Sequence, residues 1–239
     1  KFVGDGSELT GVASTENIRT NTNATFLQNI NVGVAITAGK LGIGFTDNNV
    51  KIGLTALDSL TTGANNTAVG DKALTANTSG DENTAVGHDA LTANTTGQGN
   101  TSVGSFALDA NTTGEFNTAV GRSALTSNTT AGDNSAFGVS ALRENTTGTA
   151  NASFGRAALQ NNTTANNNSA FGYQALKLNT TGTQNVAVGS NALDANTTGG
   201  SNLAVGHNAL TSNTTASNNT AVGRDAMRDT TTGTQNAAF

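Results

Sequence analysis

Residues 83–99 read Asn-Thr-Ala-Val-Gly-His-Asp-Ala-Leu-Thr-Ala-Asn-Thr-Thr-Gly-Gln-Gly, and this 17-residue unit recurs along most of the chain. Ten full copies occupy residues 66–235, without an insertion or a deletion between them. The first glycine of the unit stands at Gly70, Gly87, Gly104, Gly121, Gly138, Gly155, Gly172, Gly189, Gly206 and Gly223. A short constant period indicates one small structural unit that is stacked on copies of itself.

The array extends slightly beyond the ten copies. An eleventh copy begins at Asn236, and a degenerate copy precedes the array, with Ile52-Gly53 in phase with Val69-Gly70. We therefore divide the chain into a short β-rich cap or adaptor, residues 1–50, and a repeat array, residues 51–239.

The unit is too short and too rich in glycine for a helical repeat. A helix pair needs more than about 30 residues, and a single helix would not tolerate glycine at two fixed places in every unit. We expect a short strand at Asn-Thr-Ala-Val and a second extended or single-turn element at Ala-Leu. The sequence thus predicts an all-β, elongated solenoid of the β-helix or β-roll type.

The two glycines of the unit are expected to differ in how strictly they are required. The first follows the strand, and we expect it to have a positive φ or to lie where another backbone comes close. The second closes the Asn-Thr-Thr-Gly corner. It is replaced by Ala131, Ala165 and Ala216 in three units, so its position is less demanding.

Stacked coils place each residue about 4.8 Å from its counterpart, so apolar residues form columns and asparagines form ladders. The expected core comprises one apolar residue before each first glycine and one leucine after it: Val69, Leu74, Val86, Leu91, Phe137, Leu142, Phe171 and Leu176. Such a thin core is marginal against an ordering cost of about 1.5 kcal/mol per residue. We therefore expect a homotrimer. One of the two columns, Val/Phe or Leu, would form the core within each chain and the other the seam between chains, and the sequence leaves open which column has which role.

The first 50 residues lack the period. The runs Asn31–Thr37 and Leu41–Phe45 are β-prone and interrupted by glycine, so we expect two short strands joined by a turn around residues 38–40. The chain opens at Lys1 without Met, and we expect it to be part of a longer protein.

The composition excludes several classes of function. Charged residues make up 11% of the chain, the net charge is −5, and cysteine is absent, so disulfides and thiolate metal sites are impossible. An acidic balance argues against a nucleic-acid groove, and no apolar run is long enough to insert into a membrane. No acid, base or nucleophile stands out from the repeat, so we expect no enzyme, no catalytic residue, no cofactor and no metal.

Variable positions inside the fixed period mark the solvent face. They include the pair after each first glycine, where His88 and His207 occupy equivalent places. In a trimer, either histidine could form a ring with its two symmetry mates, which is the functional interpretation. The favoured interpretation is that both are ordinary exposed surface histidines. Phe106, Phe116 and Tyr173 could offer flat platforms to sugars, although rings at such positions more often pack on a neighbouring chain.

The unit Asn-Thr-Ala-Val-Gly-x-x-Ala-Leu-x-x-Asn-Thr-Thr-Gly resembles the repeats of long bacteriophage tail-fibre proteins, especially those of marine phages such as cyanophages. The segment Phe2–Val12 is similar to a second motif of such fibres, with Glu8 where glycine is frequent. The resemblance implies a trimeric fibre in the virion, which contacts other tail proteins and a receptor or glycan on the host cell. Many related fibres end in a self-cleaving chaperone domain, and nothing in this sequence matches it.

Two alternatives share the expected architecture. The head of a bacterial trimeric autotransporter adhesin has a similar Ala-Ile-Gly core, but its period is shorter, and it would place the chain on a bacterial cell surface. An ice-binding solenoid needs a flat Thr-x-Thr array, whereas Thr112 and Thr113 are adjacent and would point to opposite faces of a strand.

Overall fold

The computed structural model describes residues 44–45 and 48–239. These residues belong to a unit that runs from Gly42 to Phe239. The predicted strand at Asn31–Thr37, the motif at Phe2–Val12 and most of the predicted strand at Leu41–Phe45 lie outside the described residues.

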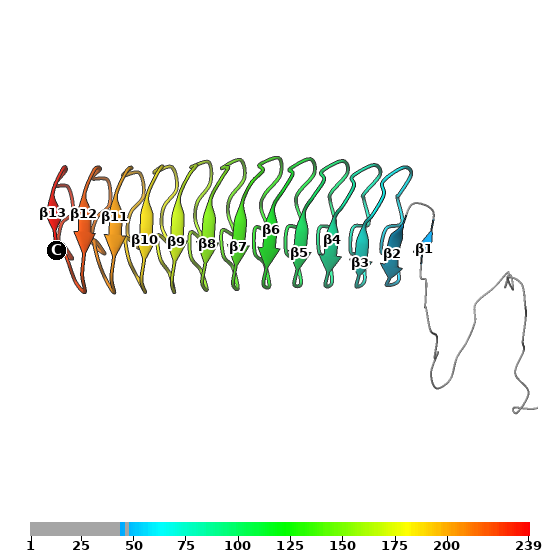
Figure 1. Ribbon diagram of the computed structural model, residues 1–239, viewed down its shortest axis with the longest axis horizontal. Helices are drawn as coiled ribbons and strands as arrows, with labels where there is room; N and C mark the ends of the chain where they lie inside the picture. The colour runs from blue at the N-terminus through cyan, green and yellow to red at the C-terminus, as the bar shows by residue number, and fades with distance from the viewer. Residues whose placement is uncertain (1–43, 46–47) are drawn as a thin grey trace, which may run out of the picture. The chain divides into compact units, whose positions relative to one another are not determined.

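The described residues form strands and turns, without a helix, and successive coils stack into a parallel β-solenoid (Figure 1). The strands are β1 Gly44–Phe45, β2 Asn49–Ile52, β3 Thr67–Val69, β4 Thr84–Val86, β5 Thr101–Val103, β6 Thr118–Val120, β7 Ser135–Phe137, β8 Ala152–Phe154, β9 Ser169–Phe171, β10 Val186–Val188, β11 Leu203–Val205, β12 Thr220–Val222 and β13 Ala237–Ala238.

All 13 strands form one sheet in chain order. From β2 to β13 every neighbouring pair is parallel, and each residue lies beside the residue 17 positions further on, as Ala68 lies beside Ala85. β1 pairs antiparallel with β2, with Gly44 opposite Val50. The all-β solenoid predicted from the period is confirmed. β2 is its first parallel strand, so the expected boundary between residues 50 and 51 falls inside that strand.

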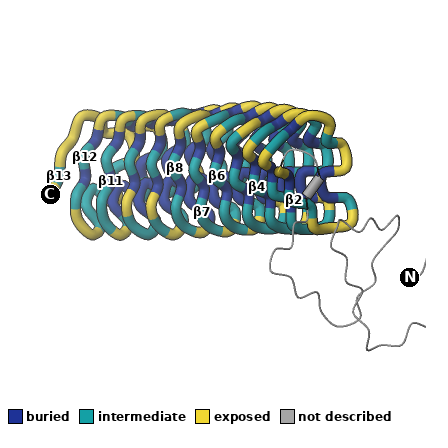
Figure 2. The backbone as a smooth tube through the Cα atoms, turned by 45° about the vertical axis from the view of Figure 1, so that its right-hand side comes forward, coloured by how far each residue is buried: buried dark blue, intermediate teal, exposed yellow. Residues whose placement is uncertain are grey.

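The middle residue of each three-residue strand points inward, because side chains alternate between the two faces of a strand. The strand Thr84–Val86 shows the pattern: Ala85 is buried, while both flanking residues are partly exposed. Most coils therefore contribute one alanine from the strand and the Ala-Leu pair from the turn to a continuous core, as Ala85, Ala90 and Leu91 do. In β5 and β8 the buried Ser102 and Ser153 take the place of the strand alanine. Figure 2 shows these buried residues along the interior and the exposed ones at the rounded edges.

This arrangement corrects half of the expected core. Leu74, Leu91, Leu142 and Leu176 are fully buried, as predicted. The strand residues expected beside them point outward, because the alanine takes the inward place: Val69, Val86 and Phe137 are only partly buried, and Phe171 is 40% exposed. The leucine column is thus the intrachain core, and the Val/Phe column lies on the surface of the chain.

The Ala-Leu element consists of tight turns. In the coil that follows β3, the N–H of Ala73 donates to the carbonyl of Gly70, and the N–H of Asn77 donates to that of Leu74. The leucine itself has a left-handed conformation, with a φ of 53° at Leu74. Such a conformation costs a non-glycine residue roughly 1–2 kcal/mol, and full burial of the leucine side chain offsets this by roughly 1.5–3 kcal/mol.

The first glycine has a positive φ in all ten units, and in every unit but the last, that of Gly223, it also lies close to the backbone of the next coil. Gly138 has a φ of 131°, and a Cβ atom on it would lie 2.7 Å from the carbonyl carbon and oxygen of Gly155 in the next coil. The second glycine has no positive φ, as Gly148 illustrates, in keeping with the alanines that replace it elsewhere.

Two ladders of buried asparagine run along the coils. In the first, the backbone N–H of Asn134 donates to Oδ1 of Asn117 at 3.1 Å, and its Nδ2 donates to the carbonyl of Gly148 at 2.9 Å. In the second, Nδ2 of Asn145 donates both to Oδ1 of Asn128 at 3.1 Å and to the carbonyl of Gly148 at 2.8 Å. Because buried amides need partners, the ladders fix the register of the coils as well as stabilising them.

Candidate interaction surfaces

The outer face of the parallel sheet carries two columns of side chains. One is polar at most strands, with threonine or serine from β3 to β7. The other is apolar at every strand from β2 to β12: Ile52, Val69, Val86, Val103, Val120, Phe137, Phe154, Phe171, Val188, Val205 and Val222. The face thus presents Thr-x-Val rather than the Thr-x-Thr pattern of an ice-binding array.

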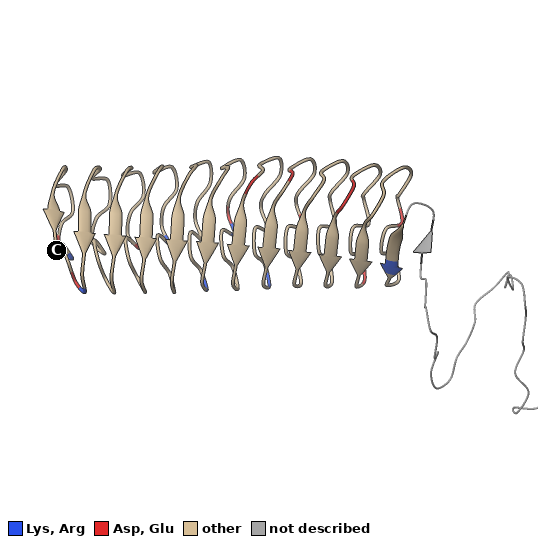
Figure 3. Cartoon of the chain, in the orientation of Figure 1, with Lys and Arg blue, Asp and Glu red and all other residues tan. Residues whose placement is uncertain are grey.

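Three aromatic rings stack in the middle of the apolar column. The ring centroids of Phe137 and Phe154 are 4.7 Å apart, those of Phe154 and Phe171 are 4.9 Å apart, and the planes are nearly parallel. Charged residues lie mainly in the segments that connect the strands (Figure 3), and strands β3–β13 contain none. The outer face is therefore an uncharged, half-exposed apolar strip.

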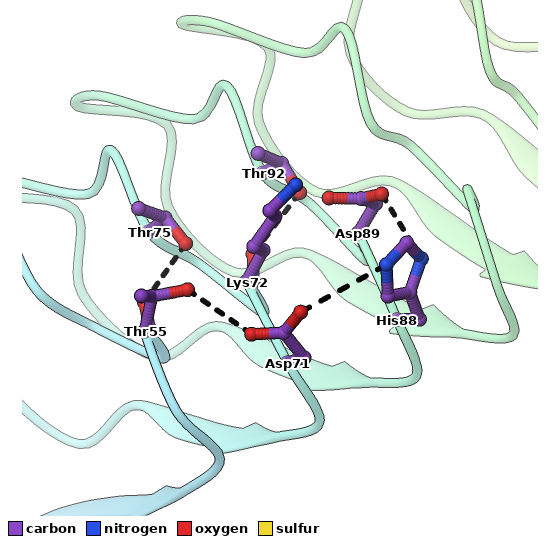
Figure 4. A network of polar contacts seen from close by, with 7 residues as sticks. All are labelled: Thr55, Asp71, Lys72, Thr75, His88, Asp89 and Thr92. Atoms are coloured by element: carbon purple, nitrogen blue, oxygen red, sulfur yellow. Dashed lines mark hydrogen bonds and ion pairs between the residues drawn. The ribbon is translucent and has the colours of Figure 1, made fainter.

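The corner that follows the strands carries charges in segregated groups. Toward the N-terminal end of the array it carries Asp71, His88 and Asp89, which belong to one polar network, with Lys72 beside them (Figure 4). His88 lies 3.0 Å from a carboxylate oxygen of Asp89 and 3.9 Å from one of Asp71. Asp71 also accepts a hydrogen bond from the hydroxyl of Thr55 at 3.3 Å.

Further along the same corner lies a groove of about 280 Å³ that is lined by Arg122, Arg143, Arg156 and Lys177. Sequence analysis assigned these positions to a general solvent face and missed their convergence. The signal was available, because the four cations fall in four consecutive units when the sequence is written in rows of 17 residues.

Both histidines are exposed, as favoured from the sequence. His88 contacts the edge of the Phe106 ring, with centroids 5.4 Å apart, and it belongs to the network of Figure 4. The proposed sugar platforms Phe106, Phe116 and Tyr173 are also exposed, by 39%, 56% and 45% respectively. Phe106 and Phe116 belong to one coil but stand ten residues apart, after the strand and at the end of the unit, and Tyr173 lies in a later coil. The structure does not bring the three rings together into one site.

Two carboxyl groups at this corner have shifted pKa values. Partial burial, together with the neighbouring charge of Asp89, raises the pKa of Asp109. A hydrogen bond of 3.0 Å from the side-chain amide of Asn208 lowers the pKa of Asp225. Neither carboxyl is paired with a nucleophile or a second acid at hydrogen-bond distance, so neither shift marks a general acid or base.

Within residues 44–45 and 48–239, no group of three or more His, Asp or Glu side chains could hold a metal ion. The same part of the chain contains no helix that is long and apolar enough to cross a bilayer. The features of the array that could engage a partner are therefore the apolar strip and the charged corners.

Comparisons with known proteins found no matching protein family, no matching curated protein and no matching solved structure.

Proposed function

We propose that this chain forms the shaft of a viral tail fibre, in which three copies assemble into a rod that supports attachment to a host cell. The observation that carries this proposal is the unbroken register of 11 parallel strand pairs, each offset by 17 residues. Every coil hydrogen-bonds to its neighbours, and such an array resists bending because each unit is fixed by the next. This mechanical property suits a fibre better than a catalytic scaffold.

The apolar strip supplies the seam for assembly. Its side chains repeat at the strand spacing of about 4.8 Å, so a second copy of the same chain offers a surface with a matching period. Association would remove the Val/Phe column from water, with a gain of roughly 25 cal/mol per Å² of apolar surface. The strip carries no charge from β3 to β13 that would have to be desolvated. Three chains joined in this way present three copies of any binding surface, which raises avidity.

Assembly can be tested by light scattering on the chain of 239 residues. We expect a particle with three times the chain mass of 23.8 kDa. The substitution Phe154→Asp places a charge in the middle of the strip and is expected to yield monomers that keep a β-rich circular dichroism spectrum. Phe116→Asp is the matched control, because Phe116 lies outside the apolar strip, in the bend that precedes β6, and is 56% exposed. A wild-type chain that remains a folded monomer at high concentration would contradict the proposed assembly.

The location can be tested by mass spectrometry of purified virions and of bacterial envelopes. We expect peptides of the array to copurify with capsid proteins. Recovery in the envelope fraction alone would contradict the fibre and favour a bacterial surface adhesin.

A further inference from the structure

We infer that the groove lined by Arg122, Arg143, Arg156 and Lys177 binds a linear anionic polysaccharide. This inference deepens the attachment role proposed above and depends on it for its biological meaning. The binding itself requires only the folded array.

The four cations are arranged as a zigzag. Arg122 and Arg156 follow the first glycine of their units, whereas Arg143 and Lys177 stand five residues after it. They belong to four consecutive coils and alternate between two adjacent columns that line one groove. At about 4.8 Å per coil, they span roughly 14 Å along the rod, with one positive charge for each coil. This spacing suits a polymer with charges at regular intervals better than a single small anion.

Small residues open the groove at this place. The position two residues after the first glycine holds Phe106 in an earlier coil, but it holds Ser140 and Ala157 between the cations. Because Ala157 is itself buried, it contributes floor rather than wall. The cationic side chains therefore stand on either side of a depression and not on a flat surface.

The cations have few competing carboxylates. Arg143 pairs with Glu144, its Nε lying 2.7 Å from Oε1. Within the described part of the chain, no ion pair engages Arg122, Arg156 or Lys177. The column five residues after the first glycine turns acidic on both sides, at Asp109 and Asp194, whereas the other column holds serine in those two coils. A chain with a net charge of −5 thus carries an isolated positive segment, which attracts anions over a limited length.

A second, neutral groove of about 540 Å³ adjoins the first and shares Arg143 with it. Its lining includes Ser127, Asn161, Thr146 and Thr163, together with Glu144, whose charge is balanced by its ion pair with Arg143. Each threonine hydroxyl donates to a carbonyl in the next coil, as Thr146 does to Thr163 at 3.0 Å, and keeps its lone pairs for another donor. Hydroxyls and amides next to guanidinium groups match a ligand that combines acidic groups with many hydroxyls, which is the chemistry of an acidic sugar polymer.

Nucleic acid fits the two grooves less well. Proteins that bind single strands stack bases on aromatic rings, and the residues that line the two grooves include no aromatic side chain.

The test measures binding of the 239-residue chain to polygalacturonate and dextran sulfate at several salt concentrations, with neutral dextran and oligouridylate as further probes. We expect binding to polygalacturonate or to dextran sulfate that weakens as salt rises, and no binding to neutral dextran. The preferred polymer then identifies the acidic group as carboxylate or sulfate. The quadruple variant R122Q/R143Q/R156Q/K177Q should lose at least tenfold in affinity.

A control variant removes the same number of cations outside the groove: K51Q/K72Q/R224Q/R228Q. It has the same net charge as the first variant and should stay within twofold of wild-type affinity. An equal loss in both variants would overturn the inference, because the attraction would then be unspecific. Failure to bind either acidic polysaccharide at low salt, or tighter binding of oligouridylate, would also overturn it.

Circular dichroism checks that both variants remain folded. Light scattering on the same samples keeps failure of assembly distinct from failure of binding, because a monomer that binds the polymer supports this inference while contradicting the trimer.

Discussion

Thr230 stands one coil beyond Asn213, at the place that asparagine occupies in the nine preceding coils, and the buried Oδ1 atom of Asn213 has no hydrogen-bond partner. In the coils before it, each such oxygen accepts a bond from the next asparagine, as Oδ1 of Asn196 does from Nδ2 of Asn213 at 3.0 Å. The second ladder therefore ends at Asn213 because one side chain in the sequence cannot continue it.

Restoring the ladder should stabilise the end of the array. In Thr230→Asn, the new amide can donate to Oδ1 of Asn213, and we expect a gain of about 1 kcal/mol in the free energy of unfolding. Urea denaturation of the variant and of the wild type measures this difference. Thr231→Asn is the control, because residue 231 is exposed, and a gain of the same size there would show that the ladder is not the cause.

The first glycine of the unit should not tolerate even a methyl group. Gly138→Ala combines a φ of 131° with a contact of 2.7 Å to the backbone of Gly155. We expect a loss of more than 3 kcal/mol, because strain and overpacking add. Gly223→Ala separates the two causes: its φ is 134°, but the nearest atom to an added Cβ is 3.8 Å away. It should cost less than half as much in the same thermal or urea denaturation, and an equal cost would show that contact plays no part.

The second glycine should be much more permissive. In units with glycine at this corner, the N–H of the second threonine donates to the next coil, as that of Thr147 does to Thr163 at 3.3 Å. In the described residues, no such backbone bond is made by Thr130, Thr164 or Thr215, which precede the three natural alanines. An added Cβ at Gly148 would lie 2.3 Å from the carbonyl oxygen of Ala165, so this corner has to shift, as the units with natural alanine show that it can. Gly148→Ala should therefore cost about 1 kcal/mol for the lost hydrogen bond plus the cost of the shift, and less than Gly138→Ala, because no positive φ adds strain. A loss as large as that of Gly138→Ala in urea denaturation would contradict the different roles of the two corners.

An exposed alanine in a left-handed conformation offers a way to stabilise the array. Ala150 is exposed and has a φ of 55°. The equivalent residue three coils earlier is a glycine, Gly99, which has a similar φ of 64°. We expect Ala150→Gly to raise the free energy of unfolding by about 0.5–1 kcal/mol, because glycine relieves the strain. Ala152→Gly, in strand β8, should lower it by a similar amount, and thermal denaturation distinguishes the two directions.

The raised pKa of Asp109 predicts a pH dependence of stability. Between the ordinary value of 3.8 and the raised value, the folded state binds a proton that the unfolded state has already lost. The free energy of unfolding therefore falls as pH rises through this window and stays lower at neutral pH. Asp109→Asn should be more stable than the wild type at pH 7 and equal to it near pH 3, as measured by thermal denaturation. A stabilisation of the same size at both pH values would rule out the ionised carboxyl as its cause.

The fold was predictable because its signal is repeated. Ten equivalent glycines reveal the period and the position of the corner. The structure confirms that glycine is required there, because the position has a positive φ and, in all but the last unit, lies close to the backbone of the next coil. The orientation of the strand was not predictable from the unit alone. Ala85 and Val86 are both apolar, and only the packing of a whole coil decides that the smaller one points inward, where Leu91 fills the remaining space.

The cationic groove was hidden for a related reason. Each of its residues occupies a position that varies freely, so none is distinctive within its own unit. Their meaning appears only when coils are stacked and positions such as Arg143 and Arg156, which are 13 residues apart in sequence, line one depression.

The fixed register also means that the length of the rod can change only in whole steps. Deleting residues 104–120 would join Val103 directly to Gly121, which recreates the Val-Gly junction that every neighbouring coil already contains. Such an excision leaves no mismatched seam and shortens the rod by one strand spacing, about 4.8 Å. Genetic recombination between units of the same period would therefore change the reach of the rod in small increments that leave its backbone register intact.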